Sequence, residues 1–203
     1  MEIPIANNSL TDFEDETDKG NHPTPLGQKK NAALVNKAIT LKRILLIFPP
    51  AYTLKHQRDI NPLPPLGIGL LAAIGEQKGF QVEILDSLIQ GWDNEIPTAY
   101  PDIVRVGLSD ADIKKAVEEF RPDVVGLSCM FSIQHKMYPR ILSVIKSANP
   151  KVITVAGGAH VTVCQEDVLK DPNCDYIITG EAEESFFELI NAIQGKRTFA
   201  SVD

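Results

Sequence analysis

Cysteine is scarce in this chain, and the three that occur lie far apart, at Cys129, Cys164 and Cys174. Their spacing matches neither a disulfide framework nor a metal-ligand pattern, so we expect no metal site built from protein side chains. Apolar runs such as residues 44–48 are far shorter than the roughly 20 residues that cross a membrane. A net charge of −7 leaves no basic face for nucleic acid. We therefore expect a cytoplasmic chain with neither a membrane nor a nucleic acid among its partners.

The chain changes character at about residue 42. Residues 1–41 are poor in large apolar side chains and carry a cluster of acidic ones, which predicts a flexible N-terminal tail. From there on, short apolar runs alternate with helical patterns. We assign residues 42–195 to one folded domain and residues 196–203 to a C-terminal extension.

The alternating pattern predicts an α/β fold, in which a doubly wound, five-stranded parallel sheet has the flavodoxin-like strand order. The strands are expected at residues 43–48, 82–86, 123–128, 151–156 and 174–179, and the helices at 66–78, 111–120, 134–148, 165–169 and 183–194. Ser109 and Asp112 form the capping-box pattern that begins the second of these helices. Residues 87–109 are expected to be a long loop, a length that is typical of functional or covering segments.

Ligands of such folds bind at the carboxyl ends of the parallel strands. The residues predicted there are Pro49 and Pro50; Ser128, Cys129 and Met130; Gly157, Gly158 and His160; and Gly180 and Glu181. The paired glycines, Gly157 and Gly158, favour either close approach of a ligand to bare backbone or simply a tight turn. His160 is expected either to cap a helix or lie at the surface, or to contact the ligand.

Several common occupants of α/β folds are excluded by the residues at these strand ends. The first strand runs into prolines and not into a G-x-G-x-x-G dinucleotide motif, and there is no G-x-x-x-x-G-K-[ST] phosphate loop. A phosphoacceptor domain needs acidic residues where Pro49, Pro50 and Ser128 stand. A Ser-His-Asp hydrolase needs a G-x-S-x-G turn, which is absent.

The segments that remain are similar to the cobalamin-binding N-terminal domain of cobalamin-dependent radical S-adenosylmethionine (SAM) enzymes. The resemblance covers roughly residues 43–194, and its motifs stand in the family's order. They are Phe48-Pro49-Pro50, Pro64-Pro65-Leu66-Gly67, Arg121-Pro122-Asp123-Val124-Val125-Gly126-Leu127-Ser128, Ala156-Gly157-Gly158-Ala159-His160 and Tyr176-Ile177-Ile178-Thr179-Gly180-Glu181-Ala182-Glu183.

The resemblance implies that cobalamin is the cofactor and that its nucleotide tail enters the sheet edge. Ser128 is the implied hydroxyl beside the tail, and Gly157 and Gly158 are implied to let the tail approach the backbone. Gly180 and Glu181, expected at the start of the last helix, are implied to meet the nucleotide sugar or phosphate through backbone N–H groups, or Glu181 through a ribose hydroxyl. The motifs around Pro49, Pro50, Leu66, Gly67, Cys129, Met130 and His160 complete the implied site.

One departure concerns the cobalt. Other cobalamin domains carry D-x-H-x-x-G after the first strand, where the histidine ligates cobalt. Here His56 lacks both the preceding aspartate and the following glycine. The resemblance therefore implies base-off cobalamin without a histidine ligand.

The implied role is that of the cofactor domain of a radical SAM methyltransferase, with no catalytic residue of its own. The iron–sulfur cluster and SAM belong to a barrel with a C-x-x-x-C-x-x-C motif, which this sequence lacks. We expect such a barrel in cis or in trans, so that the chain is a fragment, a truncated product or a separate module. The alternatives are a cobalamin carrier or sensor, and a degenerate Rossmann-like domain that binds another nucleotide.

Overall fold

The computed structural model describes residues 40–55, 62 and 64–196. Nearly all of the predicted tail, His56 and residues 197–203 lie outside the described part. The main sheet consists of five parallel strands: β1 (Arg43–Phe48), β3 (Gln81–Asp86), β6 (Val124–Ser128), β7 (Ile153–Gly157) and β8 (Tyr176–Ile178). Their order across the sheet is β3-β1-β6-β7-β8. The predicted fold class and its flavodoxin-like order are confirmed.

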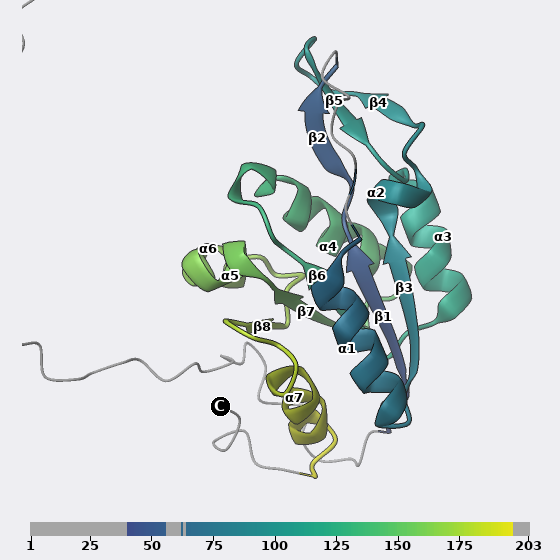
Figure 1. The fold of residues 1–203 in the computed structure, drawn as a ribbon, viewed down its shortest axis with the longest axis vertical. Helices are drawn as coiled ribbons and strands as arrows, with labels where there is room; N and C mark the ends of the chain where they lie inside the picture. Colours follow the sequence, from purple (N-terminus) through teal and green to yellow (C-terminus); the bar gives the residue numbers. More distant parts are fainter. Residues whose placement is uncertain (1–39, 56–61, 63, 197–203) are drawn as a thin grey trace, which may run out of the picture.

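Helices pack on both faces of this sheet (Figure 1). Helices α1 (Leu66–Gln77) and α7 (Ser185–Ile193) lie on one face. Helices α3 (Asp110–Phe120) and α4 (Met137–Ala148) lie on the other. Two short helices, α5 (Ala159–Val163) and α6 (Gln165–Leu169), connect β7 to β8.

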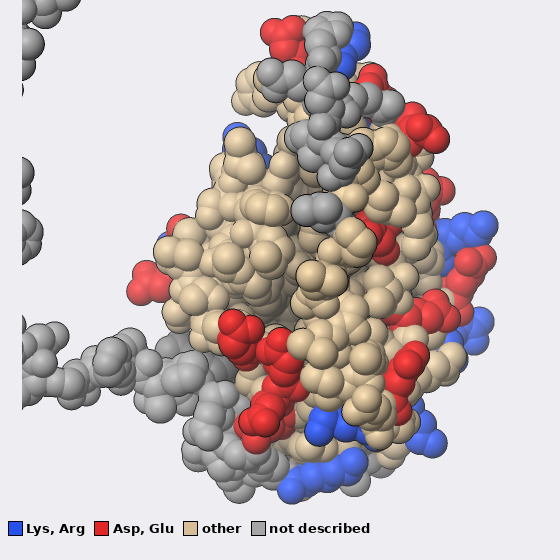
Figure 2. All heavy atoms as spheres, viewed as in Figure 1, with Lys and Arg blue, Asp and Glu red and all other residues tan. Residues whose placement is uncertain are grey.

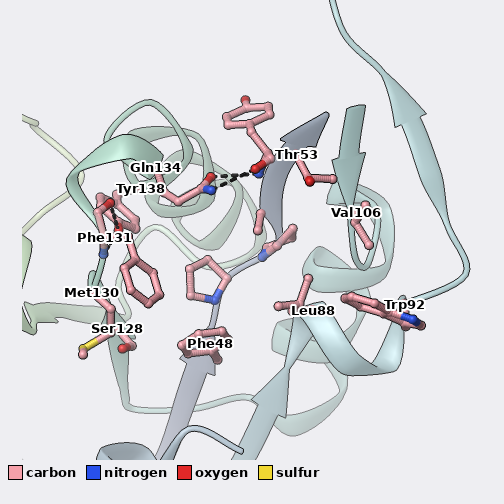
Figure 3. A pocket seen from close by; sticks show the side chains of 14 residues that line it. Phe48, Thr53, Leu88, Trp92, Val106, Ser128, Met130, Phe131, Gln134 and Tyr138 are labelled. Atoms are coloured by element: carbon pink, nitrogen blue, oxygen red, sulfur yellow. Dashed lines mark hydrogen bonds between the residues drawn. The ribbon is translucent and has the colours of Figure 1, made fainter. Parts of the chain in front are cut away.

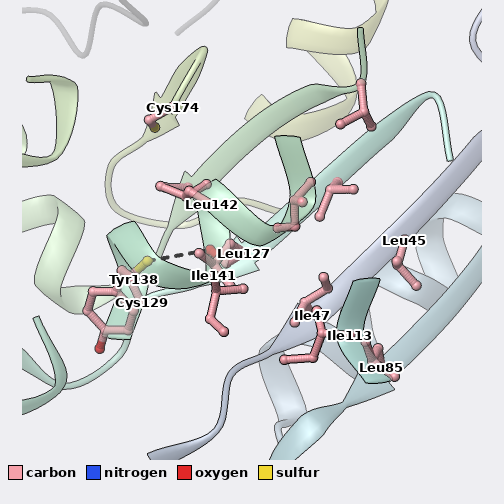
Figure 4. Packing of buried hydrophobic residues seen from close by; sticks show 14 of the residues in the cluster. Leu45, Ile47, Leu85, Ile113, Leu127, Cys129, Tyr138, Ile141, Leu142 and Cys174 are labelled. Carbon is pink, nitrogen blue, oxygen red and sulfur yellow. Dashed lines mark hydrogen bonds between the residues drawn. The ribbon is translucent and has the colours of Figure 1, made fainter. Parts of the chain in front are cut away.

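The alternation of side chains along β1 explains why both faces are covered. Leu45 and Ile47 belong to the core under α3 and α4 (Figure 4), whereas Ile44 and Leu46 belong to the core under α1 and α7. Successive residues of a strand point to opposite faces, so a continuous apolar run can only be buried between two layers of helices. The strand's hydrophobicity therefore dictates the layered architecture.

The prediction of a long loop over residues 87–109 is wrong about the secondary structure. That segment forms α2 (Ser87–Gln90), β4 (Glu95–Pro97) and β5 (Ile103–Val106). Together with β2 (Ala51–Leu54) the two strands form a separate antiparallel sheet in the order β2-β5-β4. These strands are only three or four residues long, too short for a clear alternating pattern.

A buried arginine anchors the small sheet to the main domain. Arg105 of β5 is 3% exposed. Its guanidinium pairs with the carboxylate of Asp110 at the start of α3, and it donates to the Leu108 carbonyl at 3.1 Å. Arg140 of α4 binds the same carboxylate, and these two arginines hold the pKa of Asp110 below its usual value against the opposing effect of burial. The ion pairs fix the small sheet above the carboxyl ends of β1 and β3.

Two helices begin later than predicted. Helix α4 begins at Met137 because residues Ser132–Gln134 form a separate 3₁₀ turn, and the last helix begins at Ser185 and not at residue 183. The predicted capping box of Ser109 and Asp112 is confirmed in both directions. No helix within the described residues is long and apolar enough to cross a membrane.

Candidate cofactor site

Two adjoining hollows occupy the carboxyl edge of the main sheet. The first, which we call the α1–α7 groove, has a volume of about 540 Å³ and lies between the N-terminal ends of those helices. The second, the β1–β2 cavity, has a volume of about 270 Å³ and lies under the small sheet. Ser128 and Met130 line both hollows, so the two adjoin at the end of β6.

Most residues predicted for the ligand edge do line these hollows. Pro49 and Pro50 line the β1–β2 cavity. The α1–α7 groove is lined by Gly67, Gly157, Gly158, Gly180 and Glu181. A β-carbon added at Gly67 would meet nothing within 4 Å, so this position contributes open space. Gly75, further along α1, differs from Gly67 because it packs closely against β3. A β-carbon added there would lie only 2.8 Å from the Val82 side chain.

Gly157 and Gly158 are adjacent, but the structure constrains them differently. Gly158 has φ +108°, and a β-carbon there would lie 2.9 Å from the carbonyl oxygen of Cys129. That carbonyl accepts from the His160 amide at 3.0 Å, while the Cys129 amide donates to the Gly157 carbonyl at 2.7 Å. Gly158 is therefore required by the turn, whereas the position of a β-carbon at Gly157 touches only the Ile178 carbonyl, at 3.8 Å. The tight-turn interpretation therefore holds for Gly158, whereas Gly157 leaves open space beside the backbone.

A threonine that no sequence pattern singled out joins the two glycine turns. The Thr162 hydroxyl accepts from the Gly180 amide at 3.0 Å and donates to the Gly158 carbonyl at 3.3 Å. Gly180 stands five residues before α7, so the expectation that it begins the helix is wrong, and its amide is already bonded to Thr162. No sequence motif marks Thr162, because its partners come from two different strand ends.

Polarity changes between the floor and the mouth of the groove. The buried lining side chains are all apolar: Leu46, Ile68, Leu127, Val155, Ile178 and Phe186. Thr162 and Glu181 are exposed at the mouth, and Ser128 and Glu183 are half-buried. On this face of the molecule, acidic side chains gather over the segment that joins β8 to α7, next to a hollow surrounded by uncharged residues (Figure 2).

Two side-chain clasps shape the β1–β2 cavity (Figure 3). The Gln134 side-chain amide accepts from the Tyr52 N–H at 2.8 Å and donates to the Tyr52 carbonyl at 3.0 Å. This side chain thus pairs with the backbone of β2 as a neighbouring strand would. The Tyr138 hydroxyl donates to the Phe131 carbonyl at 2.6 Å and accepts from its amide at 2.9 Å. Burial raises the pKa of Tyr138 to about 12. Leu88 and Trp92 also line this cavity, so part of the segment predicted as a loop belongs to the site.

Three predicted residues lie away from both hollows. Leu66 is 82% exposed at the start of α1, outside either lining. Cys129 is fully buried in the core under α4 (Figure 4), and burial raises the pKa of its thiol well above the usual value. His160 is 7% exposed, with its Nδ1 atom 3.0 Å from the Ser132 hydroxyl and its ring 5.3 Å from that of Tyr138. Burial, followed by the charge of His135, lowers the pKa of His160.

The described residues offer no protein metal centre. Within residues 40–55, 62 and 64–196, no group of three or more His, Cys, Asp or Glu side chains is placed to hold an ion. Neither hollow has a histidine among its lining residues in that part of the chain. What the site does offer is a deep apolar groove, a bare stretch of backbone and a polar mouth. Such a site suits a large ligand with one apolar end.

Comparison with known proteins points to one family. The model of the B12 binding domain matches residues 61–190. Over 159 residues, the chain is 37% identical to cytidylyl-2-hydroxyethylphosphonate methyltransferase of Streptomyces wedmorensis, an alignment that covers 76% of this chain and 29% of that protein. An uncharacterized methyltransferase of Pyrococcus horikoshii is 29% identical over 161 residues, covering 79% and 31% respectively. The chain thus spans less than a third of the length of these relatives.

Solved structures share the fold. The cobalamin-dependent S-adenosylmethionine radical enzyme OxsB, with aqua-cobalamin and S-adenosylmethionine bound, superposes with a TM-score of 0.60 at 20% identity, over 80% of this chain and 20% of that enzyme. A cobalamin-binding protein from Desulfitobacterium hafniense gives a TM-score of 0.50 at 17% identity, over 75% of this chain and 58% of that protein.

Proposed function

This chain belongs to the B12-binding domain family, whose cofactor is cobalamin, and we propose that the α1–α7 groove holds the nucleotide tail of the cofactor. The corrin ring then lies at the shared mouth, next to the β1–β2 cavity. The observation that carries this proposal is the bare backbone at Gly157, where a β-carbon would meet only one carbonyl at 3.8 Å. Gly67 leaves similar space across the groove.

The polar residues at the mouth match the polar parts of the tail. Ser128 stands where the apolar floor ends, and its hydroxyl is suited to donate to a ring nitrogen of the base. Glu181, exposed at the mouth, is suited to accept from a ribose hydroxyl. When bound, cobalamin supplies a cobalt centre that takes up and hands on a methyl group. This chain's part is to hold the tail and to orient the ring.

We further propose that cobalamin is bound base-off and without a histidine ligand. The groove draws the base away from the ring, and the described lining of both hollows contains no histidine. The His160 ring is instead held with its Nδ1 atom at the Ser132 hydroxyl. His56, the remaining candidate near the first strand, lies outside the described residues.

The methyltransferase relatives support a role as the cofactor part of a radical SAM methyltransferase. In this proposal the iron–sulfur cluster and SAM are held by a barrel in cis or in trans, and the present chain has no catalytic residue. The cytoplasmic location expected from the sequence remains a prediction. A carrier or sensor role is the alternative, and it predicts a cobalamin-dependent complex with a protein that lacks such a barrel.

The first experiment is to incubate the purified chain with hydroxocobalamin, desalt it and record the visible spectrum. A retained base-off spectrum is expected. A retained base-on spectrum would contradict the proposed seat of the tail while leaving the cofactor in place. Loss of the chromophore from a chain that is folded by circular dichroism would favour the degenerate nucleotide-binding alternative.

A further inference from the structure

The floor of the α1–α7 groove has no polar side chain ready to meet a polar ligand. Its buried lining consists of aliphatic and aromatic residues. The polar side chains among the described lining residues are all half-buried or exposed: Ser128, Thr162, Glu181 and Glu183. The described residues that keep an unpartnered buried side-chain nitrogen or oxygen are Arg43, Ser87, Arg105 and Gln194, and none of them lines the groove.

Three backbone groups at the glycine turns of the groove are also engaged. The Gly157 carbonyl accepts from the Cys129 amide at 2.7 Å. The Gly158 carbonyl accepts from the Thr162 amide at 3.1 Å and from its hydroxyl at 3.3 Å, and the Gly180 amide donates to that hydroxyl. A base that reaches the floor of the groove therefore meets apolar side chains, because the polar side chains of the lining, Ser128 among them, are not buried there.

We propose that this groove selects corrinoids whose lower base is apolar, such as the dimethylbenzimidazole of cobalamin, over corrinoids with a purine base. The inference rests on the proposed seat of the nucleotide tail. Dimethylbenzimidazole has methyl groups at its far end and a ring nitrogen near the sugar, which matches an apolar floor and a hydroxyl close to the mouth. Adenine carries an amine and further ring nitrogens at its far end, where the floor offers no partner.

The size of the preference comes from the cost of burying unpaired polar groups. A buried donor or acceptor that loses its hydrogen bonds to water costs enough to weaken binding roughly 5- to 150-fold. Apolar contact between the methyl groups and the floor adds to the difference. We therefore expect the full chain to bind cobalamin at least about tenfold more tightly than its adenine-based analogue, pseudocobalamin.

The experiment measures dissociation constants of the whole chain for cobalamin, pseudocobalamin and cobinamide, a corrinoid without the nucleotide tail. The expected order of affinity is cobalamin, then pseudocobalamin, then cobinamide. Equal affinity for cobalamin and pseudocobalamin, both tighter than cobinamide, would overturn the selectivity and leave the proposed function standing. Equal affinity for all three would contradict the proposal that the α1–α7 groove holds the nucleotide tail. Binding of none, by a folded chain, would overturn the proposed function.

A pair of matched variants locates the selectivity in the floor. Val155→Thr places a hydroxyl on the floor in nearly the same volume, and we expect it to narrow the preference for cobalamin over pseudocobalamin by about fivefold or more. Val144→Thr makes the same change at a half-buried position on α4, away from both hollows, and should leave the ratio unchanged. If a variant is partly unfolded, its apparent affinities for cobalamin and pseudocobalamin fall by the same factor, so their ratio does not change. Thermal unfolding measures the stability of each variant separately. An unchanged ratio in Val155→Thr would contradict the inference.

Discussion

The Thr162 hydroxyl accepts a hydrogen bond from the Gly180 amide at 3.0 Å, across 18 residues of sequence. The same hydroxyl donates to the Gly158 carbonyl at 3.3 Å, so one side chain joins the turn after β7 to the turn after β8. Both turns line the α1–α7 groove. The spacing between the two walls of the groove therefore depends on a side chain that need not touch the ligand.

Replacing this hydroxyl should loosen the groove. Thr162→Val keeps the shape but removes both hydrogen bonds, each worth about 0.5–1.5 kcal/mol, and we expect cobalamin to bind roughly 3- to 30-fold more weakly. Thr162→Ser keeps the hydroxyl and should bind nearly as tightly as the unmodified chain. Equilibrium dialysis with each variant measures the effect. Weakening by Thr162→Ser but not by Thr162→Val would show that the methyl group, and not the hydroxyl, matters.

The paired glycines should respond differently to substitution. Gly158→Ala forces a side chain into a left-handed conformation 2.9 Å from a carbonyl, so we expect a loss of stability of about 2 kcal/mol or more. Gly157→Val extends into open groove and should leave the stability within about 1 kcal/mol, while weakening cobalamin binding by about tenfold or more. Urea unfolding and dialysis together separate the two effects. A Gly157→Val chain that binds normally would place the ligand elsewhere.

The Gln134 clasp should hold the small sheet over the β1–β2 cavity. Gln134→Ala removes both hydrogen bonds to Tyr52, and the expected cost is about 1–3 kcal/mol of unfolding free energy. Gln134→Glu keeps the acceptor for the Tyr52 amide but loses the donor, so its effect should be intermediate. The rate of hydrogen exchange at the Tyr52 amide measures the clasp directly, because this amide donates to Gln134, and we expect faster exchange in Gln134→Ala. Unchanged exchange in Gln134→Ala would mean that the β2–β5 pairing alone holds the strand.

Stability should fall as the pH is lowered, in part through His160. Burial, with a smaller effect of His135, lowers the pKa of His160 in the folded chain below its ordinary value of 6.5. The unfolded chain therefore takes up a proton first, so the stabilisation is complete above about pH 6.5 and is lost as the pH falls through the lower folded pKa.

A variant tests this linkage. His160→Asn retains a polar atom for Ser132 but cannot be protonated, so its melting temperature should fall less between about pH 7 and about pH 5 than that of the unmodified chain. His135→Gln should keep most of the pH dependence, because burial is the larger cause. If His160→Asn has the unmodified chain's full pH dependence, other groups are responsible for it.

Local sequence patterns predicted the main sheet because the signals there are local. The run of apolar residues in β1 requires cover on both faces, and alternating strands and helices then require parallel crossovers. The small sheet could not be predicted in this way. Its strands are short, and β2 pairs with β5, whose partner residues are about 50 positions away, as in Tyr52 with Arg105.

The layered α/β fold and the glycines at the strand ends were settled by the amino-acid sequence, because apolar periodicity and backbone freedom are properties of short segments. Which neighbours of those glycines face the site depends on packing in three dimensions. Ser128 and Cys129 are adjacent in sequence, yet one lines the groove and the other is fully buried in the opposite core. His160 turns to Ser132, and Thr162 reaches Gly180, since these contacts form only when separate strand ends pack together in space.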